Sequence, residues 1–210
     1  MDLQSTYDRI AAHFSKTREH AWPEVESFLE GRSGTLALDV GCGNGRHTEA
    51  LATRAETAVG VDLSRGLLDE AAARALGRGF ADATEFVHGD AAALPVRDDA
   101  VDLGVYVATL HHLSPRAARI ESLNELARAL APGGVALVSA WSTAHDRFDR
   151  DDGFDTTVDW TLPGGETVPR YYHIYSPSEF ESDLDESALE TLETAVSSGN
   201  CYATVSAPDS

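Results

Sequence analysis

The order of apolar and polar positions divides the chain into short buried runs and longer stretches with helical spacing. Two stretches near the start, residues 4–14 and 21–30, place apolar residues three and four positions apart, as amphipathic helices do. From residue 35 onward, short apolar runs alternate with helical stretches. These runs predict five strands, at residues 35–41, 57–63, 84–90, 101–108 and 135–141.

Helices are predicted between these strands, at residues 45–54, after Ser64 and at 116–130. Ser64 stands where a hydroxyl can cap the first turn of the helix that follows. Strands and helices that alternate with short connections form a parallel sheet with helices on both faces, joined by crossovers of one hand. The first two thirds of the chain therefore predict a doubly wound α/β fold.

The pattern changes after Ser142, where a long polar stretch with glycine and proline runs to about Arg170. A short helix is predicted from Ser178, and two strands within residues 188–206 form a hairpin around Ser198-Gly199-Asn200. The hairpin brings the expected number of strands in the sheet to seven.

The elements together predict a single α/β domain over residues 1–210, a length that suits one domain. Residues 1–33 are expected to cover the ligand site, and residues 143–175 to be an insertion on its substrate side. No apolar run approaches the ~20 residues of a membrane span, and the N-terminus lacks a secretory signal, so we expect a cytoplasmic protein without membrane contact. Cys42 and Cys201 form no disulfide framework or zinc-ligand pattern and are interpreted as reduced core residues.

The formal net charge is −19, and Lys16 is the only lysine. Strong acidity argues against a nucleic-acid partner, because phosphate binding needs cations. A second interpretation is adaptation to very high salt, since at ~1 M salt the Debye length falls to ~3 Å and self-repulsion is screened. We favour the halophilic interpretation because the acids are spread along the chain, for example at Asp98–Asp99, Asp146–Asp152 and Glu179–Glu190. Composition therefore does not decide the substrate.

The first predicted strand ends in a glycine turn, Gly41, Gly43 and Gly45, directly after Asp39. Glycines at a strand-to-helix turn let the backbone approach a ligand closely. The dinucleotide pattern needs its third glycine at position 46, which is Arg46, so the nicotinamide interpretation weakens.

Two further acids, Asp62 and Asp90, close the second and third strands at the same carboxyl edge, where such folds bind ligands. A carboxylate at the second strand end can accept ribose hydroxyls, and one at the third can meet an adenine amino group. The order of glycine loop and two acids resembles the class I S-adenosylmethionine-dependent methyltransferases. That resemblance implies a Rossmann-like, seven-stranded, mostly parallel sheet with a C-terminal antiparallel strand, and S-adenosylmethionine as cofactor. It implies cofactor-binding roles for Tyr7, Asp39, Gly41, Gly43, Asn44, Asp62, Leu63, Asp90, Ala91 and Val107.

A closer resemblance covers most of the chain. The segments YDRIAAHFSKTR (7–18), ATLHHLS (108–114) and RYYHIYSPSEF (170–180) are similar to the tRNA wobble-uridine carboxymethyl methyltransferases. The family's Asn-Trp-Tyr-Val motif reads Asn200-Cys201-Tyr202-Ala203 here, which removes the tryptophan from that point. The resemblance implies methyl transfer to the carboxylate of a 5-carboxymethyl-type uridine in the tRNA anticodon loop, giving a methyl ester.

A carboxylate acceptor, with an ordinary pKa of ~4, is ionised at neutral pH and needs orientation rather than a general base. Arg18 is the candidate clamp, or else a surface arginine at a helix end. His111 and His112 follow the fourth strand, and either can bond the acceptor; neither has a metal partner at useful spacing, so no metal site is expected. Tyr171, Tyr172 and His173 can stack on or bond an unpaired base, or pack on the last strands. Arg9, Arg18, Arg46 and Arg170 are expected to converge on the cofactor edge and to contact the RNA, with Arg9 and Arg170 as substrate-binding residues, and Trp141 is expected to lie in the core.

The same resemblance implies a small zinc-binding activator subunit as partner in a heterodimer. We expect such a partner to cover a strongly apolar outer strand. Three other functions compete: a methyltransferase for a quinone or metabolite acid, a cofactor-binding regulator without catalysis, and a nicotinamide oxidoreductase. The glycine spacing disfavours the last, and the segments HFSKTR and RYYH disfavour the first only by resemblance.

Overall fold

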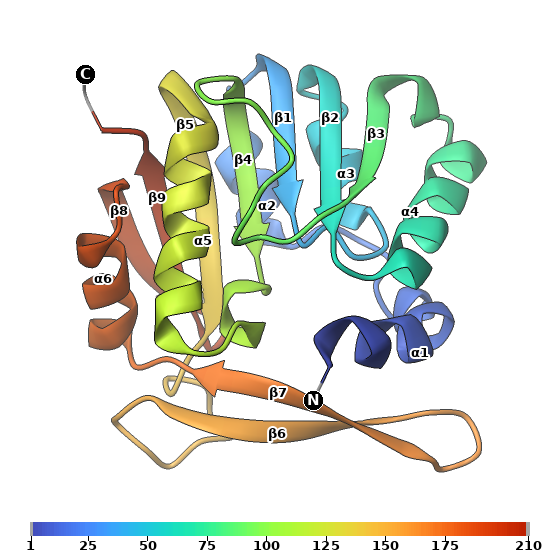
Figure 1. The fold of residues 1–210 in the computed structure, drawn as a ribbon, viewed down its shortest axis with the longest axis vertical. Coiled ribbons are helices and arrows are strands. Elements are labelled where there is room, and N and C mark those ends of the chain that lie inside the picture. Colours follow the sequence, from blue (N-terminus) through green and yellow to red (C-terminus); the bar gives the residue numbers. More distant parts are fainter. Residues whose placement is uncertain (1, 209–210) are drawn as a thin grey trace.

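The computed structural model describes residues 2–208, which form a seven-stranded sheet flanked by helices and a separate two-stranded hairpin (Figure 1). The strand order in the large sheet is β3-β2-β1-β4-β5-β9-β8. Its strands are β1 (Gly34–Val40), β2 (Ala55–Asp62), β3 (Thr84–His88), β4 (Val101–Val107), β5 (Leu130–Trp141), β8 (Glu190–Ser197) and β9 (Asn200–Ser206). The helices are α1 (Leu3–Lys16), α2 (Pro23–Leu29), α3 (Arg46–Leu51), α4 (Arg65–Arg78), α5 (Arg116–Ala129) and α6 (Pro177–Glu186), with short 3-10 turns η1 (Ala81–Ala83) and η2 (Leu110–His112).

The five strands from β3 to β5 pair in parallel, and β9 runs antiparallel between β5 and β8. This topology confirms the predicted doubly wound, mostly parallel seven-stranded sheet. Apolar side chains on its two faces form two separate clusters. One gathers around α5 and α6, with Leu123, Leu126 and Phe180; the other gathers around α2, with Val25 and Phe28. Burial on both faces is what makes the central strands read as continuous apolar runs.

Ser64 caps α4 as predicted, because its hydroxyl accepts a hydrogen bond of 3.1 Å from the backbone N–H of Leu67. The hydroxyl in turn donates to Asp8 in α1 at 2.7 Å. The cap therefore also fixes the N-terminal helix against the start of α4, beside the carboxyl edge of the sheet.

The polar stretch after Ser142, for which no helix or strand was predicted, contains two strands, β6 (Phe154–Thr161) and β7 (Thr167–Ile174). Along β6, half-buried and exposed residues alternate, which gives the hairpin one face toward the protein. The hairpin crosses the carboxyl edge of the large sheet (Figure 1). Trp160 in β6 ties it to α1 by donating its indole N–H to Nδ1 of His13 at 3.0 Å.

The outer strand β8 differs from the expectation of a strongly apolar edge. Leu192 and Val196 are exposed there, but Glu190 and Glu193 interrupt them. Cys201 in β9 and Cys42 are both buried free cysteines, which confirms the expected burial of these two residues. None of the helices within residues 2–208 has the length and apolar character required to cross a membrane.

Candidate active site

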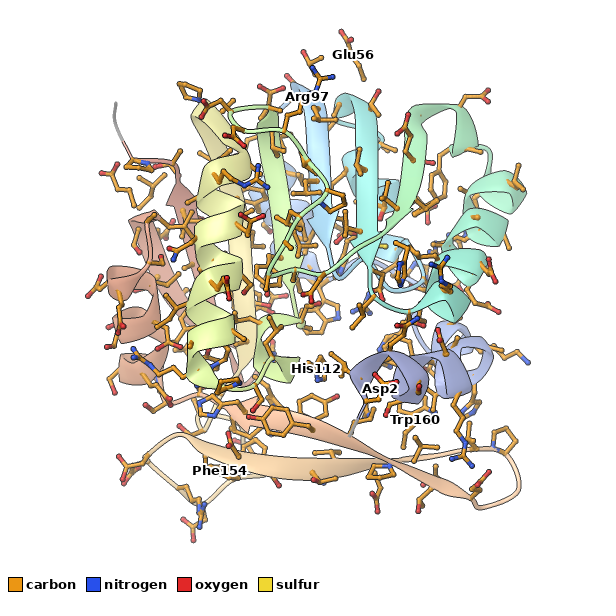
Figure 2. The ribbon with its side chains drawn as sticks, in the orientation of Figure 1. Asp2, Glu56, Arg97, His112, Phe154 and Trp160 are labelled. Carbon is orange, nitrogen blue, oxygen red and sulfur yellow. The ribbon has the colours of Figure 1, made fainter. Side chains whose placement is uncertain are left out.

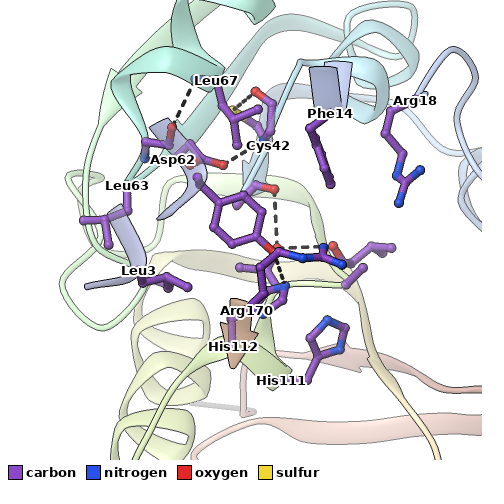
Figure 3. Close-up of a pocket in the computed structure, with 18 of the residues that line it drawn as sticks. Leu3, Phe14, Arg18, Cys42, Asp62, Leu63, Leu67, His111, His112 and Arg170 are labelled. Carbon is purple, nitrogen blue, oxygen red and sulfur yellow. Dashed lines mark hydrogen bonds between the residues drawn. The ribbon is translucent and has the colours of Figure 1, made fainter. Parts of the chain in front are cut away.

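A cavity of about 410 Å³ opens at the carboxyl edge of the sheet, between the strand ends, α1 and the β6–β7 hairpin. Figure 2 shows His112 between the end of the sheet and the hairpin that carries Trp160 and Phe154. In the close-up of Figure 3, Asp62 and Leu63 lie toward one end, and Arg170, His112 and His111 gather toward the other. The cavity therefore has two chemically different ends.

The glycine loop follows β1 and has left-handed backbone at Gly41, Gly43 and Gly45, with φ of 70°, 54° and 76°. A Cβ at Gly41 would lie 2.2 Å from the hydroxyl of Thr109, in the loop after β4. Only glycine fits both the backbone conformation and this close approach. At Gly41 and Gly43 the loop thus presents backbone to the cavity, as a nucleotide-like cofactor requires.

The acids of the cavity lie at its glycine-loop end. Asp62 accepts hydrogen bonds of 2.8 Å from the backbone N–H groups of Gly43 and Ser64, and burial raises the pKa of its carboxyl. Asp90 is exposed, and one of its oxygens accepts from the N–H of Ala92 at 2.9 Å. Both side chains line the cavity with acceptor oxygens, which suits ribose hydroxyls and an amino group.

Asp39 lies behind the glycine loop rather than in the cavity wall. Its carboxylate is buried and accepts a hydrogen bond of 2.6 Å from the hydroxyl of Thr48 in α3, and burial raises its pKa to about 7. The side chain of Asp39 is therefore not placed to contact a cofactor in the cavity directly, as the resemblance had implied. The carboxylate instead holds α3 against the end of β1, which positions the loop.

Asn44 is buried and connects the glycine loop to the N-terminal segment. Its side-chain amide donates to the carbonyl oxygens of Ser15 and Arg18, at 3.2 and 2.9 Å. These bonds fix the end of α1 beside the loop. They explain how Tyr7 and Arg18, from a segment outside the sheet, come to line the cavity.

His112 is neutral, with both ring nitrogens occupied. Its Nδ1 lies 2.9 Å from the carbonyl oxygen of Tyr171, which can only accept, so Nδ1 carries the proton. Nε2 is then the acceptor for the Tyr7 hydroxyl at 2.8 Å. Burial lowers the pKa of His112 to about 4. This histidine holds α1 and β7 together at the cavity.

His111 has the opposite tautomer. Its Nδ1 accepts a hydrogen bond of 2.9 Å from the backbone N–H of Trp141, so its proton is on Nε2. Burial holds the pKa of His111 well below its ordinary value. Nε2 of His111 has no hydrogen-bond partner among residues 2–208, and the residue lines the cavity. Of the two histidines, His111 is the one that offers a free donor.

Arg170, on β7, is buried at 6% exposure and lines the cavity. Its guanidinium carbon lies 5.0 Å from the centroid of a Trp160 ring and 5.2 Å from that of Tyr172. Nε of Arg170 has no hydrogen-bond partner in the described part of the chain. Arg18 lies over the same Trp160 at 5.7 Å, and its own pKa is lowered by burial. Two cations therefore meet at the end of the cavity opposite the acids.

Two groups of arginines differ in their partners. Within residues 2–208, six arginines form ion pairs with carboxylates: Arg9, Arg74, Arg78, Arg116, Arg119 and Arg128. None of these six lines the cavity. The arginines that do line the cavity have no such partner within residues 2–208: Arg18, Arg46, Arg147 and Arg170. In a chain with 35 acids against 16 Lys and Arg, this separation leaves the positive charge of the cavity free for an anion.

Three residues expected at the substrate lie outside the cavity. Arg9 is exposed and paired with Glu166 at the tip of the hairpin. Tyr171 donates its hydroxyl to Asp155 at 2.8 Å. His173 is buried between Asp155 and Glu179, at 2.7 and 2.9 Å. The structure therefore places these side chains away from the strand ends, whereas Tyr172 of the same segment lines the cavity.

The sequence interpretation missed one wall of the cavity. Trp141, expected in the core, is half-buried and lines it, together with His145, Arg147 and Asn200. The signal was the end of β5, because residues after the carboxyl ends of parallel strands face the ligand. Among residues 2–208, no group of three or more His, Cys, Asp or Glu side chains is placed to hold a metal ion.

The fold and the cavity together define a class I methyltransferase. A model of the methyltransferase domain family matches residues 38–138. Over 205 residues the chain is 32% identical to the Encephalitozoon cuniculi protein named "Putative methyltransferase ECU09_1500", and the match covers 94% of this chain and 91% of that one. The chain belongs to the S-adenosylmethionine-dependent methyltransferase family.

Two further relatives are named for a tRNA substrate. The tRNA (carboxymethyluridine(34)-5-O)-methyltransferase of Saccharomyces cerevisiae is 32% identical over 174 residues, which cover 80% of this chain and 59% of the yeast protein. The mouse tRNA (carboxymethyluridine(34)-5-O)-methyltransferase ALKBH8 is 36% identical over 141 residues, 67% of this chain and 20% of the mouse protein. The chain thus spans less than two thirds of either relative.

Solved structures agree on the fold. The CcbJ methyltransferase of Streptomyces caelestis superposes with a TM-score of 0.81 at 19% identity, covering 100% of both chains. A Haloferax volcanii structure described as a complex with the Trm112 methyltransferase activator gives 0.72 at 17% identity, covering 100% of this chain and 99% of that one. At these identities the likeness concerns the fold alone.

Proposed function

We propose that this protein transfers a methyl group to tRNA, at the carboxylate of a 5-carboxymethyl-type wobble uridine, and so forms a methyl ester. The observation that carries the proposal is the set of cavity arginines without carboxylate partners among residues 2–208, above all buried Arg170 with its unpaired Nε. A buried cation without a partner is costly, so its persistence argues for an anionic ligand. The names of the yeast and mouse relatives support the same acceptor.

The residues present fit the family's cofactor. The glycine loop leaves room for close backbone approach, and the oxygens of Asp62 and Asp90 would hold the ribose and the adenine. S-adenosylmethionine supplies the methyl group when bound. Arg18 and Arg170 would orient the acceptor carboxylate, and the free Nε2–H of His111 would donate to it. No base is required, because a carboxylate with pKa of about 4 is already ionised.

A small zinc-binding activator subunit is proposed as partner, in a heterodimer. The likeness to the Haloferax volcanii chain supports this proposal at the level of the fold. Binding to the chain through an exposed patch such as Leu192 and Val196 would protect the β8 edge. The chain alone should then be poorly soluble or bind the cofactor weakly, and full solubility and activity alone would contradict the partner.

The test of the acceptor is transfer of labelled methyl from S-adenosylmethionine to bulk tRNA, with and without the zinc-binding subunit, at high salt. We expect label in tRNA. If the label is absent from tRNA but present in extracted small molecules, while cofactor binding is intact, the acceptor is a metabolite acid and not tRNA. Arg170→Ala should weaken tRNA binding, whereas Arg9→Ala, already paired with Glu166, should leave it nearly unchanged.

A further inference from the structure

The end of the cavity farthest from the cofactor acids is built by β5 and β9. In the sheet order, Asp62 ends β2, Asp90 follows β3, the glycine loop follows β1, and His111 follows β4. Trp141 ends β5, and Asn200, its register partner, begins β9. Neighbouring strands are about 4.8 Å apart, so this corner lies one to two strand spacings beyond His111. A group held there is on the far side of the acceptor carboxylate from the cofactor.

Trp141 presents an aromatic surface to this corner. Its ring centroid lies 5.4 Å from that of Tyr172 and 4.9 Å from that of Phe148, so neighbouring rings fix its orientation. The next residue along β9, Cys201, points into the core and is 2% exposed. The tryptophan at this corner of the cavity therefore comes from β5 and not from the position of the missing family tryptophan.

Two hydrogen-bonding groups border the ring. The guanidinium carbon of Arg147 lies 5.7 Å from the centroid of Trp141, and the side chain is exposed without an ion pair in residues 2–208. His145 accepts a hydrogen bond at Nδ1 from the N–H of Arg147 at 3.0 Å, which places its proton on Nε2. Its ring packs against Gly199, where a Cβ would approach to 2.5 Å. The corner thus combines a fixed aromatic ring with donors.

We propose that Trp141 and Arg147 form the binding subsite for the uracil ring of the acceptor, which makes them specificity-determining residues. This inference rests on the proposed function. In a 5-carboxymethyluridine the ring is joined to the carboxylate through one methylene, so a carboxylate held by Arg18 and Arg170 places the ring beside Tyr172 and Trp141. Aromatic and guanidinium groups are the usual stacking partners of an unpaired base.

The experiment is calorimetric titration of 5-carboxymethyluridine nucleoside into the enzyme saturated with S-adenosylhomocysteine. Trp141→Leu and Arg147→Ala should each weaken binding of the nucleoside by about tenfold, the effect of one lost stacking contact. Arg147→Lys keeps the charge but not the planar group, and should stay weakened. Arg150→Ala is the matched control, because Arg150 stacks on Phe154 at 4.6 Å and does not line the cavity.

Unchanged nucleoside affinity in both variants would overturn the inference, and since Arg147 is exposed, Arg147→Ala decides even if Trp141→Leu does not fold. Weakened binding of tRNA with unchanged binding of the nucleoside would also overturn it, because the corner would then contact another part of the RNA. If the unaltered enzyme transfers methyl to tRNA, either of these two results contradicts the proposed uracil subsite but leaves the proposed function intact. No transfer to tRNA by the unaltered enzyme would overturn the proposed function as well.

Discussion

The hydroxyl of Tyr7 donates to Nε2 of His112 at 2.8 Å, although 105 positions separate the two residues. The bond joins the N-terminal helix to the loop after β4. His112 also bonds the backbone of β7, so one neutral imidazole connects three segments around the cavity. The N-terminal helix is thus part of the site.

Tyr7→Phe should lower the free energy of unfolding by about 1 kcal/mol, because Nε2 of half-buried His112 loses its donor. It should also weaken binding of S-adenosylhomocysteine, since Tyr7 lines the cavity. The matched control is Tyr171→Phe, which removes a hydroxyl bonded to Asp155 outside the cavity. Denaturation and cofactor titration of both variants check this. Equal cofactor affinity in the two would contradict a role for Tyr7 at the site.

Arg170→Met should abolish most methyl transfer while leaving the unfolding free energy unchanged or higher. The buried guanidinium has no ion pair to lose within residues 2–208, and a charge-assisted contact to the acceptor is worth about tenfold or more in rate. Arg119 is buried to a similar degree but pairs with Glu179 and Asp183, at 3.7 and 3.6 Å. Arg119→Met should therefore cost about 3 kcal/mol of stability. A large stability loss in Arg170→Met would contradict the account of a free cation.

Asp39 should make the protein less stable as pH rises. Its pKa is about 7 in the folded chain against an ordinary 3.8, so unfolding releases a proton between about pH 4 and 7. The contribution of Asp39 to the free energy of unfolding is largest below pH 4. Between pH 4 and 7 it falls by up to about 1.4 kcal/mol per pH unit, and above pH 7 it no longer changes. Asp39→Asn, which can still accept from Thr48, should remove this dependence. Urea denaturation of the unaltered protein and of Asp39→Asn at several pH values checks this prediction. Free energies of unfolding that change in parallel with pH in the two proteins would contradict it.

Salt should stabilise the protein. With a net charge of −19, self-repulsion between carboxylates is screened as the Debye length falls from about 10 Å at 0.1 M to about 3 Å at 1 M salt. The thermal unfolding midpoint should therefore rise between these concentrations of potassium chloride. Sucrose, which stabilises by exclusion without screening charge, is the control. A midpoint that is constant or falls with salt would count against the halophilic interpretation.

The glycine-loop end of the cavity could be predicted from sequence because strand ends are local signals. Gly41, Asp62 and Asp90 each follow a short apolar run, and parallel pairing brings all three to one edge. The hairpin was missed for the opposite reason. Its strand β6 is polar, and its half-buried face is recognisable only by what it packs against, such as Trp160 against His13.

The pairing of charged side chains could not be predicted either. Arg9 and Arg170 looked equivalent along the sequence, yet Arg9 pairs with Glu166 at the surface, and Arg170 is buried without a carboxylate partner in the part of the chain that the structure describes. That difference depends on the three-dimensional position of acids from distant segments. The prediction that Trp141 lies in the core was wrong because an apolar residue at the end of a strand can belong either to the core or to the wall of a cavity.

The central claim is that the methyl acceptor is a carboxylate on tRNA. The most direct measurement is to label tRNA with methyl from S-adenosylmethionine and then treat it with mild alkali. A methyl ester hydrolyses, so the account predicts that the label is released as methanol and that Arg170→Met prevents its incorporation. Label that stays in the RNA after alkali would show methyl on a ring atom or ribose and would contradict the carboxylate acceptor.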